Sequence, residues 1–240
     1  MVLLQHAINL LNDAADWRLG ADVEKWDSWV RVHGEDVTTA IRHGWLSFLA
    51  GGLLGLMTLV RSDRLWILVI ALPMVGLGYL YNSGAKPLSY TRLGEWVTGL
   101  CYGPGVFGCL WLVTGQVTNL STLLGCAAYG CLAVALLLSH QPPQIRTDRE
   151  AGKQSFAARY GAVRTYQAVR ILFLMFLVSW GIALQYQQPD VVTAVLYLAL
   201  SCLAFAGTYN KDLGPKYLLT WSSGVILTQT LGAVHLPAGI

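Results

Sequence analysis

The first segment able to do chemistry lies close to the N-terminus, where an apolar run ends in clustered acidic residues. Asn12, Asp13 and Asp16 follow the run Val2–Leu11, and Asp22 stands shortly after them. If a helix continues through this segment, Asn12 and Asp16 share one face with Asp13 beside them. Three oxygen-bearing side chains in one place suit Mg²⁺, which takes a few carboxylates and completes its shell with water and phosphate oxygens. Asn and Asp are also common at helix ends, so a simple cap is the alternative interpretation.

The second such segment covers residues 139–161 and mixes carboxylates with a larger number of cations. Asp148 stands among Arg146, Arg149 and Lys153. Arg offers a planar fork of donors for phosphate oxygens, and Lys offers a point charge. With Asp148 as a metal ligand, the pattern indicates a site that holds Mg²⁺ and a pyrophosphate together. A solvated basic loop beside a membrane is the alternative.

Composition shows which elements must position these segments. Of the 240 residues, 55% are hydrophobic and 12% are charged, whereas a soluble domain carries about 25% charged residues. Several apolar runs approach the roughly 20 residues that cross a bilayer as a helix. We therefore predict an all-α, multi-pass transmembrane bundle of seven complete spans plus a partial N-terminal helix. The expected spans are Trp45–Val60, Leu65–Tyr81, Glu95–Thr114, Leu120–Ser139, Val169–Gln185, Val191–Tyr209 and Tyr217–Leu236.

The connections between these spans fall into two classes. Residues 12–44, 82–94, 140–168 and 210–216 are polar, and alternate crossings place all four on one side of the membrane. Most Lys and Arg residues fall on that side, while Arg61 and Arg64 fall on the other. By the positive-inside rule the four polar connections are cytoplasmic. We expect an integral protein of the bacterial inner membrane.

Three motifs in this order resemble the UbiA superfamily of intramembrane aromatic prenyltransferases over nearly the whole chain. The family's first motif, N-D-x-x-D followed by Gly and Asp, matches Asn12, Asp13, Asp16, Gly20 and Asp22. Its second motif, D-R-x-x-G-K followed by R-x-G, matches Asp148, Arg149, Gly152, Lys153, Arg159 and Gly161. A third marker, residues 81–88 with Leu93-Gly94-Glu95, is similar to the loop between the family's fourth and fifth helices.

One position departs from the family pattern. The second motif usually opens with Asp four residues before the one that matches Asp148, and Gln144 stands there instead. A Gln oxygen can ligate a hard cation but adds no negative charge, so we expect Mg²⁺ binding to depend more on Asp16 and Asp148. Gln144 after Ser139-His140 is similar to the 1,4-dihydroxy-2-naphthoate phytyltransferase branch, and so are residues 22–34. This similarity favours a naphthoate acceptor over 4-hydroxybenzoate.

The resemblance implies an activity and a set of site residues. It implies Mg²⁺-dependent transfer of a prenyl group from an allylic prenyl diphosphate to an aromatic acceptor in quinone biosynthesis, by one domain covering residues 1–240. The expected partners are these two substrates and membrane lipid, without nucleic acid. The implied metal ligands are Asn12, Asp13, Asp16, Gln144 and Asp148; the diphosphate contacts are Lys25, Arg149 and Lys153; the acceptor contacts are Tyr81 and Lys86; and Asp16, Asp148 and Lys153 carry catalysis. His140 either assists proton removal or bonds locally.

Two other functions remain open at this point. The family usually has nine helices with the first motif after the second helix, so the first helix and most of the second are apparently missing here. That gap and Gln144 favour a catalytically degenerate family member. A small membrane transporter would place ionisable groups inside its spans, and the apolar runs contain almost none.

Overall fold

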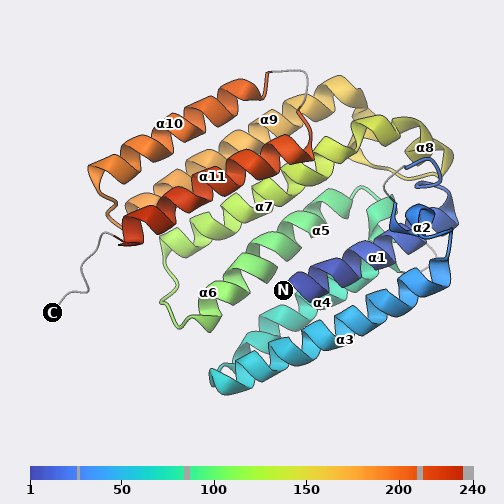
Figure 1. The fold of residues 1–240 in the computed structure, drawn as a ribbon, viewed down its shortest axis with the longest axis horizontal. Helices are drawn as coiled ribbons and strands as arrows, with labels where there is room; N and C mark the ends of the chain where they lie inside the picture. Colours follow the sequence, from blue (N-terminus) through green and yellow to red (C-terminus); the bar gives the residue numbers. More distant parts are fainter. Residues whose placement is uncertain (26–27, 84–86, 210–212, 235–240) are drawn as a thin grey trace.

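The computed structural model describes residues 1–240 except 26–27, 84–86, 210–212 and 235–240 (Figure 1). The described residues are helical and contain no β-strand, which confirms the predicted fold class. The elements in chain order are α1 (Val2–Leu19), α2 (Trp29–Val32), α3 (Val37–Arg61), η1 (Leu65–Ile67), α4 (Leu68–Asn82), η2 (Leu88–Tyr90), α5 (Gly94–Leu100), the π-helix η3 (Cys101–Gly108), α6 (Cys109–Val113), α7 (Leu120–His140), η4 (Pro142–Gln144), α8 (Ile145–Glu150), α9 (Phe156–Gln185), α10 (Val191–Gly207) and α11 (Pro215–Val234).

Helices fall at all seven positions where the sequence predicts a span. Among the described residues, five helical segments are long and apolar enough to cross a membrane: Val37–Arg61, Leu65–Asn82, Gly94–Val113, Leu120–His140 and Phe156–Gln185. Helix α10 is apolar but shorter, at 17 residues. Helix α11 occupies the seventh predicted position, and Leu236 lies outside the described residues. Large apolar side chains such as Leu49, Leu53 and Met57 point outward, as expected for a surface that faces lipid.

The predicted helix boundaries are wrong where helices extend beyond the apolar run. Helix α3 begins at Val37 rather than Trp45, because Asp36 caps it by accepting a hydrogen bond from the Thr39 amide at 2.9 Å. Helix α9 begins at Phe156 rather than Val169, and its helical geometry is interrupted at Gly161. Polar turns at the membrane surface are helical without being apolar, so hydropathy alone misses them.

The predicted span Glu95–Thr114 is a composite of α5, η3 and α6. The π-helical stretch contains Pro104, which has no amide hydrogen to donate and locally widens the helix. Close packing accompanies this distortion, since a Cβ on Gly103 would lie 2.5 Å from the Cys126 carbonyl oxygen of α7. Small residues at such contacts let membrane helices approach one another.

The helices are arranged so that the two chemically active segments meet. Helix α1 packs mainly against α3 and also touches α4, while α7 packs against α9 within a core that includes Phe173, Phe176 and Leu138. The C-terminal end of α1, the short helices α2 and α8, and the start of α9 lie at one end of the bundle, on the right in Figure 1. Residues 12–25 and 140–156 therefore lie together.

Candidate active site

A cavity of about 340 Å³ opens at this end of the bundle, between α1, α5, α7 and α8. It is lined by Asn9, Asn12, Asp13, Asp16, Asp22, Lys25, Tyr81, Ser89, Gly94, Glu95, Leu137, His140, Gln141, Gln144, Asp148, Lys153 and Ser155. Most of these side chains are polar or charged, and all three predicted motifs contribute to them. The cavity thus combines segments that are far apart in the sequence.

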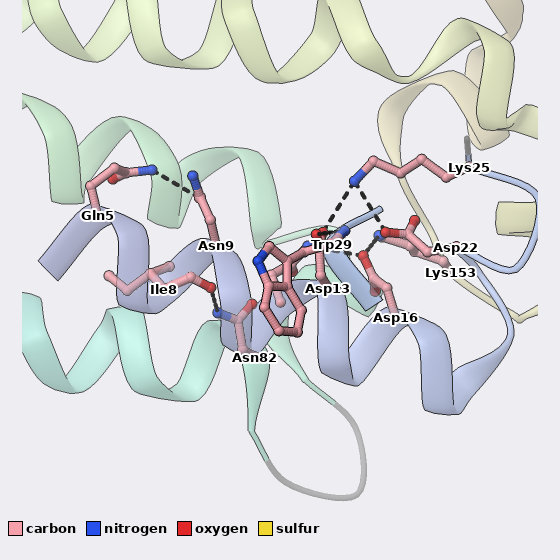
Figure 2. A network of polar contacts seen from close by, with 11 residues as sticks. Gln5, Ile8, Asn9, Asp13, Asp16, Asp22, Lys25, Trp29, Asn82 and Lys153 are labelled. Carbon is pink, nitrogen blue, oxygen red and sulfur yellow. Dashed lines mark hydrogen bonds and ion pairs between the residues drawn. The ribbon is translucent and has the colours of Figure 1, made fainter. Parts of the chain in front are cut away.

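Asp16 forms the connection between the first and second motifs (Figure 2). Only 2% of this residue is exposed, and its Oδ2 accepts hydrogen bonds from Asn12 Nδ2 at 3.0 Å and from Lys153 Nζ at 2.8 Å. Asp16 and Lys153 are 137 positions apart in the chain. The helical spacing of Asn12 and Asp16 is confirmed, because α1 continues through both to Leu19. The other carboxylate oxygen, Asp16 Oδ1, is buried and has no hydrogen-bond partner among the described residues.

Asp148 is equally buried, at 1% exposure, and also lines the cavity. Its Oδ2 accepts a hydrogen bond from the hydroxyl of Ser155, which also caps the start of α9 by accepting from the Ala158 amide. Asp148 and Lys153 belong to one turn, since the Lys153 amide donates to the Asp148 carbonyl at 2.7 Å.

The two acidic motifs end in the same backbone structure. In each, a Gly with positive φ follows the Asp by four residues: Gly20 at 86° after Asp16, and Gly152 at 71° after Asp148. The next amide then bonds back to the Asp carbonyl, from Ala21 at 2.9 Å and from Lys153 at 2.7 Å. This is a Schellman-type helix end, in which Gly adopts the left-handed conformation without steric cost. In both motifs the Gly therefore ends the helix about one turn after the Asp, and that Asp lines the cavity.

The remaining carboxylates of the first motif share one cation. Lys25 Nζ lies 3.2 Å from Asp13 Oδ1 and 3.1 Å from Asp22 Oδ2. The other oxygen of Asp13 accepts from the Trp29 amide at 2.9 Å. Both oxygens of Asp13 therefore have protein partners, in contrast to Asp16.

Burial and crowding shift the protonation of these groups. Burial, followed by the negative charge of Asp16, raises the pKa of Asp22 to about 6. Burial also raises the pKa of Asp148, against the opposing charge of Lys153. Burial alone would lower the pKa of Lys153, but the carboxylates of Asp16 and Asp148 outweigh it and raise that pKa. Lys153 is thus held as a buried cation, with its side chain only 14% exposed.

The third marker and the segment between its two parts contribute Glu95 and Tyr90, to which the sequence assigned no role. Glu95 Oε1 accepts from the Phe156 amide at 2.7 Å, and Glu95 Oε2 pairs with Arg159 at 3.4 Å, so Glu95 holds the start of α9. The ring of Tyr90 lies 5.3 Å from Lys153 Nζ. Burial, and then the charge of Asp16, raise the pKa of Tyr90. Glu95 stood in the Leu93-Gly94-Glu95 marker, which was the one signal available for it.

Most residues predicted for the site line this cavity, and Arg149 does not. Arg149 is exposed and donates from Nε to the Ala158 carbonyl at 2.9 Å, away from the cavity lining. Lys86 lies outside the described residues. His140 lies at the cavity and its Nδ1 contacts the Leu136 carbonyl oxygen at 2.8 Å, which is the local bond expected of a histidine at a helix end.

The donor set fits a magnesium ion that arrives with a phosphate ligand. Among the described residues, no three His, Cys, Asp or Glu side chains come close enough to hold a metal by themselves. Mg²⁺ commonly takes one or two carboxylates and completes its shell with water and substrate phosphates. The buried and unpartnered Asp16 Oδ1 is the kind of oxygen such an ion requires. Several other oxygen-bearing side chains line the same cavity, and none of the lining residues is Cys.

Comparison with known proteins places the chain in a family of membrane enzymes. Residues 1–222 match the UbiA prenyltransferase family, so the chain belongs to that family. Prenyltransferases of this family generally use Mg²⁺ together with the diphosphate substrate. The family membership and the apolar helices together indicate an integral membrane protein.

Several curated relatives act on naphthoate rings, as the predicted branch implies. A 1,4-dihydroxy-2-naphthoate octaprenyltransferase of Bacillus subtilis (strain 168) is 28% identical over 162 residues, which are 66% of this chain and 51% of that protein. One of Mycobacterium tuberculosis (strain ATCC 25618 / H37Rv) is 27% identical over 91% of this chain and 74% of its own length. A 2-carboxy-1,4-naphthoquinone phytyltransferase of Synechocystis sp. (strain ATCC 27184 / PCC 6803 / Kazusa) is 26% identical, over 85% and 68% respectively.

The match thus spans about half the length of the Bacillus subtilis relative. No solved structure matches the chain at a significant level.

Proposed function

We propose that this protein transfers a prenyl group from an allylic prenyl diphosphate to 1,4-dihydroxy-2-naphthoate or a related ring, as a step of quinone biosynthesis. The observation that carries the proposal is the shared cavity of Asp16 and Asp148, in which Lys153 Nζ lies 2.8 Å from Asp16 Oδ2. The naphthoate enzymes among its relatives support the choice of acceptor.

The donor diphosphate would bind among the carboxylates and cations at the polar end of the cavity. Asn12, Asp13, Asp16, Gln144 and Asp148 would hold Mg²⁺, which when bound neutralises charge on the departing diphosphate. Asp16 offers an oxygen without a protein partner, whereas Asp13 would have to release Lys25 or the Trp29 amide.

The cations of the site would neutralise the rest of the diphosphate charge. Lys153 and Lys25 both line the cavity, and each is held by carboxylates. Arg149 would join them only by giving up its bond to the Ala158 carbonyl. The prenyl C–O bond then breaks with its electron pair on the diphosphate, and a C–C bond forms to the aromatic ring. The attacked ring carbon then releases its proton, which restores the aromatic ring. Exclusion of water by apolar helices protects the allylic cation.

Acceptor contacts complete the proposed assignment. Tyr81 lines the same cavity at the end of α4 and would hydrogen-bond the aromatic acceptor. Lys86 is proposed as a partner for the acceptor carboxylate from its place in the motif. We further propose that the polar end of the bundle is cytoplasmic and that the protein resides in the bacterial inner membrane, because Lys and Arg concentrate in the segments at that end.

The test is a transfer assay with product identification. Membranes that contain the protein are incubated with Mg²⁺, a labelled prenyl diphosphate and a panel of aromatic acids. We expect a prenylated naphthoate product that EDTA abolishes and added Mg²⁺ restores. Membranes with Asp16→Asn protein serve as the control for background enzymes. Failure of every acceptor to yield product, with folded protein present, would contradict the proposal and favour a degenerate family member.

A further inference from the structure

A second cavity, of about 390 Å³, lies on another face of α1, between α1, α3 and α4. Asn9, Asn12, Asp13 and Asp16 of α1 face the first cavity, whereas Leu11, Ala14, Ala15 and Arg18 face the second. The two sets alternate along the sequence because, at 3.6 residues per turn, they lie on different faces of the helix. Most of the second lining is apolar, and Arg18 and Asn82 supply its polar chemistry together with Ser83.

Asn82, which lines this cavity, has an unsatisfied hydrogen-bond acceptor. The residue is 7% exposed, and its Nδ2 donates to the Ile8 carbonyl at 2.9 Å (Figure 2). Its Oδ1 is buried and has no partner among the described residues. A buried polar atom without a partner reduces stability, so it indicates a missing water or ligand. The ligand group required here is a hydrogen-bond donor.

Arg18 supplies a cation at the same cavity without an acidic partner in the described part of the chain. Both lysines of the first cavity, in contrast, are paired with carboxylates. Arg18 stands in the last turn of α1, where the helix dipole favours a positive charge. The dipole accounts for a cation at that position, but it leaves the unsatisfied Asn82 oxygen unexplained.

The geometry suits a ligand at the membrane surface. Arg18 and Leu11 both line the cavity and are seven residues apart, a rise of about 10 Å along the helix. Helical side chains lean toward the N-terminus, which for Arg18 is the direction of Leu11. Trp45 and Tyr79, whose ring centroids are 6.0 Å apart, also line it. Trp and Tyr are enriched where a membrane meets water.

We propose that this second cavity binds the headgroup of an anionic phospholipid that carries free hydroxyl groups. The phosphate would lie on Arg18, a headgroup hydroxyl would donate to Asn82 Oδ1, and the acyl chains would leave toward the lipid-facing surface. Phosphatidylglycerol supplies both groups. Phosphatidylcholine has no headgroup hydroxyl, and its ammonium group cancels the negative charge, so it does not satisfy the site.

The test measures lipid binding by native mass spectrometry of the purified, delipidated full chain. Equal amounts of phosphatidylglycerol and phosphatidylcholine are offered, with glycerol phosphate as a headgroup without acyl chains. We expect preferential binding of one phosphatidylglycerol, and a loss of affinity of about tenfold in Arg18→Gln. Ala15→Phe fills the cavity and is expected to give a similar loss.

Arg42→Gln is the matched control, because Arg42 is an exposed cation of α3 that does not line the cavity. Equal binding of both lipids, unchanged binding in Arg18→Gln, or an equal loss in Arg42→Gln would each overturn the proposal. Binding of glycerol phosphate as tight as that of the lipid would overturn the assignment to a membrane lipid. The readout involves no prenyl transfer, so its result is independent of the proposed enzyme activity.

Discussion

Helix α1 separates two cavities of similar volume whose linings have opposite character. The cavity of about 340 Å³ is lined by charged groups that neutralise one another, with Lys25 and Lys153 each held by carboxylates. The cavity of about 390 Å³ is mainly apolar, and its one described cation, Arg18, has no carboxylate partner. Cavity size therefore says little about function. What distinguishes the candidate active site is the convergence of charged side chains from distant segments.

The two cavities also differ in how their buried polar groups are stabilised. In the first, the carboxylate of Asp16 is stabilised by Asn12 and Lys153, and only one of its oxygens is left for a ligand. In the second, the unsatisfied atom is a neutral amide oxygen on Asn82. A cation is the natural partner for the former and a neutral donor for the latter. A buried oxygen without a partner thus indicates a cation in the first cavity and a neutral hydrogen-bond donor in the second.

The largest expected effect is loss of transfer when either central carboxylate of the first cavity is neutralised. Asp16→Asn and Asp148→Asn should each reduce the rate at least about a hundredfold, because charge stabilisation of the leaving group is lost. Initial rates in membranes check this, at matched amounts of folded protein. Asp36→Asn is the control, since Asp36 caps α3 outside the cavity and Asn is an equivalent cap. Full activity in both variants would remove the metal assignment.

The second effect concerns stability. Lys153→Met leaves the Asp16 carboxylate buried without its cation and should destabilise the protein by about 3 kcal/mol. The double variant Asp16→Asn with Lys153→Met should recover part of this loss, since no charge is then left unpaired, yet transfer should stay absent. Thermal unfolding in detergent measures both, with Lys216→Met as an exposed control. If the double variant is less stable than Lys153→Met alone, the pair is not the source of the effect.

A smaller effect is expected when charge is added to the first cavity. Gln144→Asp restores the usual carboxylate of the family motif and should lower the Mg²⁺ concentration for half-maximal rate a few-fold. Gln154→Asp adds the same charge at an exposed position that does not line the cavity. A severe loss of transfer in Gln144→Asp, with Gln154→Asp unaffected, would assign Gln144 a different role.

The smallest effect is a pH dependence of stability that Asp22 produces. Its pKa is about 6 in the folded protein against an ordinary value of 3.8. Between these values the folded state binds more protons than the unfolded state, so the free energy of unfolding falls as pH rises. Relative to Asp22→Asn, the wild type should lose a few degrees in Tm between about pH 4 and 7, since 1 kcal/mol corresponds to about 2–4 °C. Parallel curves for the two proteins would contradict the shifted pKa.

The helices could be predicted from the sequence more completely than the contacts within the candidate site. Apolar runs predicted helices at all seven positions, because hydropathy is a property of the chain itself. The ends of α3 and α9 were missed because their first turns are polar. The resemblance to the UbiA superfamily implied that Asp16 and Asp148 share one site, but no pattern revealed that Asp13 would be occupied by Lys25 and the Trp29 amide.

The roles of Glu95 and Tyr90 depend on packing that the sequence does not encode locally. Glu95 meets the Phe156 amide across 61 positions, and Tyr90 meets Lys153 through its ring face. Such contacts join segments far apart in the chain, and the motifs do not specify how those segments pack. Arg149 shows the converse, because its motif position suggested a diphosphate contact while its side chain bonds to the Ala158 carbonyl.

The most direct test of the central claim is Mg²⁺-dependent binding of an unreactive prenyl thiolodiphosphate, measured by calorimetry on the purified protein. If Asp16 and Asp148 act on one anionic ligand, the wild type should bind the analogue only with Mg²⁺, and Asp16→Asn and Asp148→Asn should each weaken binding by at least about tenfold. Equal, metal-independent binding by all three proteins would show that the shared cavity is not the diphosphate site.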